Sequence, residues 1–123
     1  MKRMDKTNSR AFGASCEWIA TRFLMERGYK ILCTNFRTRT GEIDIIAEKD
    51  GYVIFVEVKA RRSKRCGLPQ EAVTPYKQRS IRKVALTYLQ KEGLLDLKVR
   101  FDVIAIVFEN EERPSIEHIP FAF

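Results

Sequence analysis

The sequence predicts an α/β fold in which one mixed β-sheet is flanked by helices. Two segments have the apolar spacing of amphipathic helices, and five short segments have the composition of strands. Their order is helix, three strands, helix, two strands, and elements in such an order usually pack as helices on a sheet. With 123 residues, of which 45% are apolar, the chain is expected to form one domain over residues 1–123. Residues 1–8 are polar and are expected to be flexible.

The two helices are predicted from apolar residues that recur at helical spacing. In the first helix these residues run from Phe12 to Leu24, and Gly28 supplies a typical C-terminal stop. In the second helix, the apolar residues from Ile81 to Leu89 follow the spacing i, i+3, i+4, i+7, i+8. Each helix therefore has one apolar side that can cover a sheet.

The strands are predicted from short segments rich in branched apolar residues. Two of them are joined by Asp50-Gly51, which is a strong signal for a two-residue hairpin turn. The last strand is expected at a sheet edge, because Pro120 has no N–H to donate to a neighbouring strand. In chain order, the predicted elements are a helix over residues 9–27, strands over 29–35, 42–48 and 52–59, a loop over 60–74, a helix over 75–92, and strands over 100–108 and 116–121.

The predicted hairpin brings charged residues to one face of the sheet. A two-residue turn places Asp44 opposite Glu57, and Glu42 opposite Lys59, with all four side chains on the same face. Directly opposed carboxylates, with Cβ atoms about 5 Å apart, repel each other. A bound Mg²⁺ (or Mn²⁺) ion would remove the repulsion, because such ions prefer carboxylate oxygens, water and phosphate. A surface ladder of two ion pairs is the alternative that the spacing leaves open.

Lys59 adds a cation to this predicted site. It lies two residues after Glu57 in the same strand, so both side chains point to the same face. In phosphodiester hydrolysis, a metal ion polarises the phosphoryl oxygen, and a nearby ammonium group can stabilise the extra negative charge of the transition state. The three residues Asp44, Glu57 and Lys59 could therefore act together on a phosphate, if the opposed carboxylates hold a metal ion.

The segments G-E-I-D (residues 41–44) and F-V-E-V-K (residues 55–59) resemble a known family. They are similar to the YraN-like bacterial family of the restriction-endonuclease-like PD-(D/E)XK nuclease superfamily, which is itself similar to Holliday-junction resolvases. The resemblance runs from about Gly13 to Asp102. It implies a restriction-endonuclease-like α-β-β-β-α-β core, in agreement with the element order derived above.

The resemblance also implies roles for individual residues. Asp44 and Glu57 would bind the metal ion, and Lys59 would be the catalytic lysine. Glu17 would be a further catalytic residue that binds the metal ion or the attacking water. Cys16 is a departure, because the family usually has a glycine immediately before that glutamate.

Two groups of residues beside the predicted site are candidates for nucleic-acid binding. Lys77 and Gln78 lie in the first turn of the second predicted helix, where a helix N-terminus attracts phosphate. A basic segment directly after Lys59 could bind the phosphate backbone without reading its sequence. This segment contains Arg61, Arg62, Lys64 and Arg65. A solvated loop, and a lysine that extends from a helix end into water, are the alternatives.

Three further residues are expected to have structural roles. Asp102 alternates in phase with apolar residues of its strand, so a buried and hydrogen-bonded carboxylate is expected there. Tyr76 and Tyr88 are expected to pack against other residues, and a position at the border of the site is an alternative for Tyr88.

Composition and charge limit the kinds of partner, metal site and cellular location that the chain is expected to have. The formal net charge of +7 favours an anionic partner, and the single histidine and three separated cysteines do not form the pattern of a zinc site. No apolar segment matches a signal peptide or a membrane span, so a cytoplasmic protein without a membrane partner is expected.

The leading hypothesis is a Mg²⁺-dependent DNA endonuclease or nuclease-like hydrolase that acts on branched or single-stranded DNA. Resolution of a junction would need two active sites and hence a homodimer. A nucleic-acid-binding module that keeps the nuclease fold without catalysis is the alternative. A protein-interaction domain is a third, and it leaves the hairpin charges unexplained.

Overall fold

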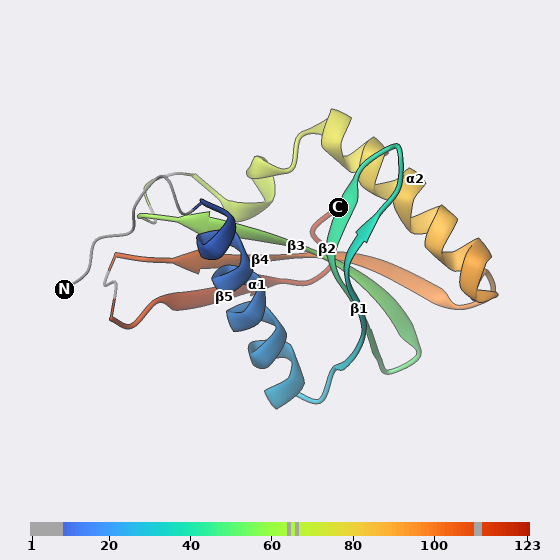
Figure 1. The fold of residues 1–123 in the computed structure, drawn as a ribbon, viewed down its shortest axis with the longest axis horizontal. Coiled ribbons are helices and arrows are strands. Elements are labelled where there is room, and N and C mark those ends of the chain that lie inside the picture. Colours follow the sequence, from blue (N-terminus) through green and yellow to red (C-terminus); the bar gives the residue numbers. More distant parts are fainter. Residues whose placement is uncertain (1–8, 64, 66, 110–111) are drawn as a thin grey trace.

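The computed structural model of the protein describes residues 9–63, 65, 67–109 and 112–123, and its elements follow the predicted order (Figure 1). Residues 1–8, which the sequence predicts to be flexible, lie outside the described residues. The elements are α1 (Ser9–Glu26), β1 (Lys30–Arg37), β2 (Glu42–Lys49), β3 (Tyr52–Arg61), the 3₁₀ helix η3 (Pro69–Ala72), α2 (Pro75–Glu92), β4 (Lys98–Val107) and β5 (Ser115–Ile119).

The predicted loop over residues 60–74 is more ordered than expected. Strand β3 continues to Arg61, because its backbone pairs with β4 up to that residue and the Arg61 carbonyl accepts a hydrogen bond from the amide of Phe108. Pro69 then begins η3, in keeping with the preference of proline for the first turn of a helix.

The five strands form one open, mixed sheet in the order β1-β2-β3-β4-β5. Neighbouring strands are antiparallel, except for β3 and β4, which are parallel. The parallel pair follows from helix α2, which provides the long crossover that two parallel strands require. These observations confirm the α/β fold class, the mixed sheet and the α-β-β-β-α-β order. They also place β5, which Pro120 follows, at an edge as predicted.

The β2–β3 hairpin has the predicted turn and, over most of its length, the predicted register. Asp50 and Gly51 both have positive φ, at 53° and 84°, as a two-residue hairpin turn requires. The paired residues run from Lys49 opposite Tyr52 to Ile45 opposite Val56.

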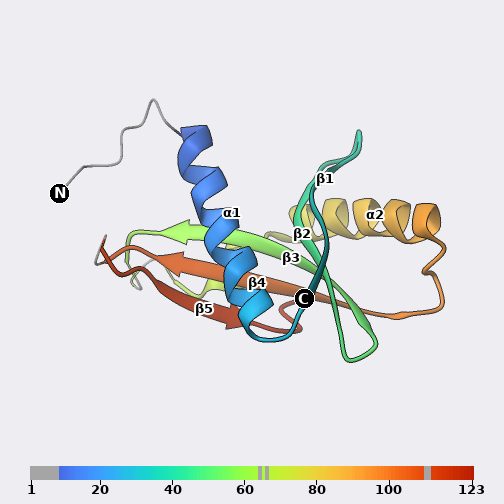
Figure 2. The ribbon, with the colours of Figure 1, turned by 60° about the horizontal axis from the view of Figure 1, so that its bottom comes forward.

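The core lies on both faces of the sheet. Helix α1 covers one face and helix α2 the other (Figures 1 and 2). Alternating strand residues belong to the two sides: Phe55 packs with the residues of α2, whereas Ile54 and Val56 pack with those of α1. Within the described part of the chain, no helix has both the length and the apolar composition needed to cross a bilayer.

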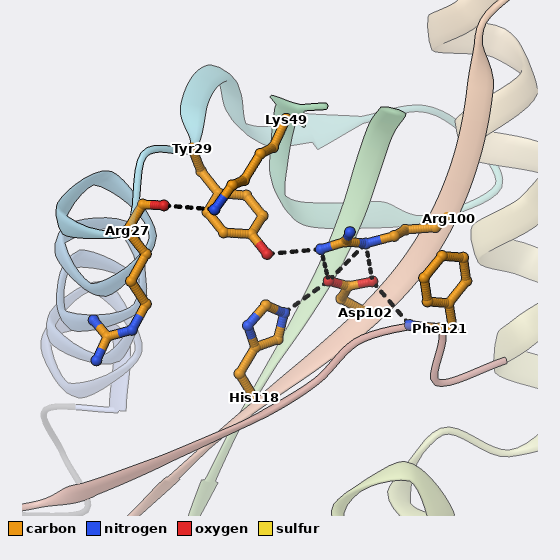
Figure 3. A network of polar contacts seen from close by, with 7 residues as sticks. All are labelled: Arg27, Tyr29, Lys49, Arg100, Asp102, His118 and Phe121. Carbon is orange, nitrogen blue, oxygen red and sulfur yellow. Dashed lines mark hydrogen bonds and ion pairs between the residues drawn. The ribbon is translucent and has the colours of Figure 1, made fainter. Parts of the chain in front are cut away.

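A buried polar network joins the two C-terminal strands to the start of β1 (Figure 3). The fully buried carboxylate of Asp102 accepts hydrogen bonds from the Arg100 guanidinium, at 2.9 to 3.2 Å, and from the amide of Phe121. Nε2 of His118 lies 2.7 Å from the same carboxylate, and Arg100 also donates to the hydroxyl of Tyr29. The predicted structural role of Asp102 is therefore confirmed.

Candidate active site

Strands β2 and β3 separate at one end of their hairpin. Their backbone pairing stops at Ile45 and Val56, so the next hydrogen-bonding position on β3, the amide of Val58, has no backbone partner on β2. The side chain of Asp44 takes this position instead, and its Oδ2 atom accepts from the Val58 amide at 2.8 Å. The separation therefore leaves an opening between the two strands, and the Asp44 carboxylate lies at its edge.

Two of the predicted residue pairs of the hairpin are not formed at this opening. Asp44 does not pair with Glu57 as backbone neighbours, nor does Glu42 with Lys59, because the ladder has already ended. Glu42 instead pairs with Arg37 of β1, and its carboxylate lies 3.4 Å from the Arg37 guanidinium. The four side chains still line one pocket, as described below.

Near the start of β2, side chains stop alternating regularly between the two faces of the sheet. Asn35 has a positive φ of 53° and lies in β1 between Thr34 and Phe36, which pair with Ile45 and Ile43. Ile45 packs with the residues of α1, whereas Ile43, two residues earlier, packs with those of α2. The start of β2 is therefore turned toward α2, and this turn carries Asp44 away from the hairpin ladder.

Gly41 allows the loop before β2 to approach α2 closely. The hydroxyl of Ser80 in α2 donates to the carbonyl of Thr40 at 2.9 Å. A Cβ atom on Gly41 would lie only 2.8 Å from the Ser80 Oγ atom, which is shorter than an ordinary contact. The glycine of the G-E-I-D segment is thus explained by packing against α2, next to the candidate site.

The site itself is a pocket of about 520 Å³ between the opening of the hairpin and the start of α2. Strand β3 and the start of β2 supply its charged floor, and the first turns of α2 supply its opposite wall. Its lining residues are Gly41, Glu42, Asp44, Glu57, Val58, Lys59, Thr74, Tyr76, Lys77, Ser80 and Ile81.

Glu57 is the buried carboxylate of this pocket. Its side chain is 4% exposed, and its Oε2 atom lies 3.1 Å from Nζ of Lys77 and 4.0 Å from Nζ of Lys59. Burial and the negative charge of Asp44 together raise the pKa of Glu57 to about 7, against the opposing effect of the two lysines. The group can therefore change its charge near neutral pH.

The neighbours of Glu57 have shifted pKa values as well. Burial raises the pKa of Asp44, opposed by its hydrogen bond from the Val58 amide. Burial lowers the pKa of Lys59, and the adjacent Lys77 lowers it further. Burial alone would lower the pKa of Lys77, but hydrogen bonds with Lys59 and Glu57 and the negative charge of Glu57 raise it. Two carboxylates and two amines thus form one coupled cluster.

The pocket residues fit a divalent cation of the Mg²⁺ type. Such ions take oxygen ligands, commonly one or two carboxylates completed by water and phosphate. Asp44 and Glu57 supply two carboxylates, and the raised pKa values of both indicate that their negative charges are incompletely compensated without a metal ion. Across the described ranges, no group of three or more His, Cys, Asp or Glu side chains is arranged to hold a metal. A cation here would therefore rely on two carboxylates.

Glu17 lies beside this cluster rather than in the pocket lining. Its Oε1 atom accepts a hydrogen bond from the side-chain amide of Asn35. Partial burial raises the pKa of Glu17, and the charges of Asp44 and Glu42 raise it further, so the three carboxylates interact electrostatically. The role of Glu17 as a metal ligand stays a prediction, and it would require a change of its contact with Asn35.

The residues predicted to bind nucleic acid have different surroundings. Arg61 donates to the carbonyls of Gly67 and Leu68, so it holds the loop after β3 in place. Gln78 donates its side-chain amide to the carbonyl of Val73 and thereby closes the turn before α2. Lys77 reaches into the pocket. These roles explain the local structure and leave nucleic-acid binding a prediction.

The remaining basic residues of that segment extend from the protein surface. Arg62 and Arg65 are exposed, whereas Lys64 lies outside the described residues.

Sequence reasoning missed two contributors to the site. Asn35 contacts Glu17, and its left-handed backbone could have been suspected because asparagine tolerates positive φ better than most residues. Tyr76 was predicted to pack, but it is 76% exposed and lines the pocket. That prediction was wrong, because the first turn of α2 extends beyond the edge of the core. The expected packing of Tyr88 is confirmed.

Comparison with known proteins gives one consistent family. Residues 16–106 match the model described as "Uncharacterised protein family UPF0102". The chain is 48% identical to the UPF0102 protein of Geotalea uraniireducens over 123 residues, which cover 100% of this chain and 97% of the relative. It is 52% identical to the UPF0102 protein of Pelobacter propionicus over 120 residues, covering 96% and 86%. It is 51% identical to the UPF0102 protein of Acetivibrio thermocellus over 108 residues, covering 87% and 83%.

Proposed function

Because this chain belongs to the UPF0102 family, and because the matched segment contains the whole pocket, we propose a function built on the pocket residues. The protein is a Mg²⁺- or Mn²⁺-dependent endonuclease of the restriction-endonuclease-like type that hydrolyses phosphodiester bonds in DNA. The observation that carries this proposal is the buried Glu57 carboxylate, which shares one pocket with Asp44 and two lysines.

The two carboxylates support the metal-binding part of the proposal. Glu57 and Asp44 come from strands that separate at this point, so a cation can approach between them without disturbing the hairpin ladder. The chemistry that Mg²⁺ supplies at such a place, when bound, is polarisation of a phosphoryl oxygen and a lowered pKa of water. Glu17, whose carboxylate interacts electrostatically with Asp44, would have to move toward the two carboxylates to become a third ligand.

The two lysines support the phosphate-binding part. Lys59 is half-buried, and its Nζ atom lies on the same side of β3 as the Glu57 carboxylate. It can donate hydrogen bonds to the attacking water or to a phosphate oxygen, and it can stabilise the negative charge that develops there. Lys77 now compensates the charge of Glu57 and can turn to a phosphate at the start of α2.

The surrounding charge supports a nucleic-acid substrate. The chain has a formal net charge of +7, and exposed arginines follow β3 directly as it leaves the pocket. Basic side chains of this kind bind the phosphate backbone and make the affinity depend on salt. A branched substrate with two equivalent cleavage points would be served by a homodimer.

A cleavage assay with a charge variant tests this proposal. Purified protein is incubated with single-stranded, duplex and four-way-junction DNA, in Mg²⁺, in Mn²⁺ and in EDTA. We expect cleavage of at least one substrate with a divalent metal, none in EDTA, and a loss of about 100-fold or more in Glu57→Ala, because the variant lacks a metal ligand.

The matched control is Glu48→Ala, since Glu48 is an exposed glutamate of the same hairpin that lies outside the pocket. Equal cleavage by Glu57→Ala and Glu48→Ala would reveal a contaminating nuclease. DNA binding that persists without cleavage of any substrate, and that Asp44→Ala leaves unchanged, would contradict the proposal. That result would favour a non-catalytic nucleic-acid-binding module.

A further inference from the structure

Tyr76 is an aromatic residue that the core does not use. Its side chain is 76% exposed, the highest value among the large apolar residues that the structure describes as exposed. Within the described residues, its hydroxyl forms no hydrogen bond and its ring contacts no other ring. The neighbouring aromatic of the same helix, Tyr88, is by contrast 5% exposed and packs against Phe55. Packing therefore does not explain an aromatic side chain at position 76.

The position of Tyr76 relates it to the candidate active site. It belongs to the pocket lining, and its high exposure places it at the rim. Lys77, the next residue, extends inward to Glu57, with its Nζ atom 3.1 Å from the carboxylate. The first turn of α2 thus presents a cation to the floor of the pocket and an aromatic ring to its mouth.

The first turn is also held rigidly. Thr74 caps α2 by accepting a hydrogen bond from the amide of Lys77, and Pro75 occupies the first turn. The carbonyl of Thr74 accepts from the amide of Gln78, whose side chain returns to Val73. A ring carried by this turn is held in place by a fixed backbone, which lowers the entropic cost of ordering it in a complex.

We propose that Tyr76 stacks on an unpaired base next to the phosphate held in the pocket, so that the substrate is a single-stranded segment of DNA. This inference rests on the proposed function, and it adds the class of substrate. In a duplex, both faces of an internal base are covered by the neighbouring base pairs, so a ring at the pocket mouth has no base face to contact. An unpaired base presents a free face, and stacking on it is independent of sequence.

The size of the pocket agrees with a single strand. A volume of about 520 Å³ suits one small-molecule-sized group, such as a nucleotide. A phosphate bound by Lys77 would lie next to the residue that carries the ring, because Tyr76 directly precedes Lys77 in the first turn of α2. Single-stranded DNA, a flap or the unpaired arm of a branched molecule would all present this arrangement.

Binding measurements test the inference without depending on turnover. Fluorescence anisotropy is recorded in Mg²⁺ with a labelled 15-nucleotide single strand and with the matching blunt duplex, in a Glu57→Gln background that prevents cleavage. We expect Tyr76→Ala to weaken single-strand binding about five- to 150-fold, the range for the loss of one stacked base. Tyr76→Phe keeps the ring and is expected to bind the single strand within about twofold of the background protein. Duplex binding is expected to be unchanged in both.

An abasic scan of the single strand gives the sharper readout. One position is expected at which removal of the base weakens binding as much as Tyr76→Ala does, and at which the two changes together weaken it no further. Trp18→Ala is the matched control, since Trp18 is an exposed aromatic on α1 that does not line the pocket.

The outcomes separate this inference from the proposed function. Equal weakening of single-strand and duplex binding by Tyr76→Ala, or additive effects at every abasic position, would overturn the stacking contact and leave the nuclease proposal standing. No measurable binding of either DNA, by the original chain as well as by the Glu57→Gln protein, would overturn both.

Discussion

Glu57 is placed where its neutral form is favoured. In the unfolded chain its pKa has the ordinary value of 4.5, whereas burial and the charge of Asp44 raise the pKa to about 7 in the folded protein. Between these two values the folded state binds more protons than the unfolded state, so this group makes the free energy of unfolding fall as pH rises. The stability lost between about pH 4.5 and 7 is on the order of 3 kcal/mol for a shift of this size.

A stability measurement of Glu57→Gln tests this residue. Glutamine is neutral at every pH, so we expect the variant to match the original chain in Tm at pH 5 and to exceed it at pH 8. Thermal unfolding by circular dichroism, in EDTA and at several pH values, gives the difference between the two proteins. Glu48→Gln, at an exposed position, should show no such difference. Parallel curves for Glu57→Gln and the original chain would show that the Glu57 carboxyl is not destabilised when charged.

At the scale of the elements, the site depends on how the loop before β2 meets α2. The Thr40 carbonyl accepts from the Ser80 hydroxyl at 2.9 Å, and the same hydroxyl leaves no room for a Cβ atom on Gly41. This contact fixes the start of β2 against the helix that carries Lys77. The packing of Gly41 against Ser80 therefore holds the strand that carries Asp44 beside the helix that carries Lys77.

The double variant of Gly41 and Ser80 tests this packing. We expect Gly41→Ala alone to destabilise the fold by about 1–3 kcal/mol, the usual cost of an inserted methyl group in a filled space. In a Ser80→Ala background the clashing Oγ atom is absent, so the same substitution should cost little. Urea unfolding of the four proteins measures the coupling between the two positions. Additive effects would mean that the loop and α2 do not press against each other.

At the scale of the whole molecule, the Asp102 network lies beside the middle of β3, where Asp102 pairs with Val56. It joins β4, β5 and the start of β1 through one buried carboxylate (Figure 3). Burial would raise the pKa of Asp102, but hydrogen bonds from His118 and Arg100 outweigh it and hold the pKa below its ordinary value. The ionised carboxylate therefore stabilises the fold above the ordinary aspartate pKa, and this contribution is lost as pH falls through the lowered value.

The Asp102→Asn variant tests how much this network stabilises the whole fold. The substitution leaves the buried Arg100 without its counter-charge, so we expect a loss of about 3 kcal/mol or more at pH 7. The difference from the original chain should shrink as pH falls below about 4, where Asp102 takes up a proton in the unfolded chain while it is still ionised in the folded protein. Urea unfolding across this pH range measures it, with Asp96→Asn as the exposed control. A constant difference at every pH would show that charge is not the source of the stability.

The sequence by itself determined the elements and much of the hairpin. Helical spacing, the Asp50-Gly51 turn and strand alternation are properties of neighbouring residues, so they predicted the α/β order and the register from Ile45 to Lys49 correctly. The grouping of Asp44, Glu57 and Lys59 on one side also followed from alternation, and the structure places all three in the same pocket.

Only the tertiary structure decided how these residues meet. The hairpin ladder ends one pair before Asp44, because the start of β2 turns to pack against α2. The sequence of the strand does not reveal this packing, because α2 lies far away along the chain. The contact of Lys77 with Glu57 and the exposure of Tyr76 depend on the same docking of α2. Local spacing thus placed Asp44, Glu57 and Lys59 on one side of the sheet, whereas the pocket around them is set by contacts between elements that are far apart in the chain.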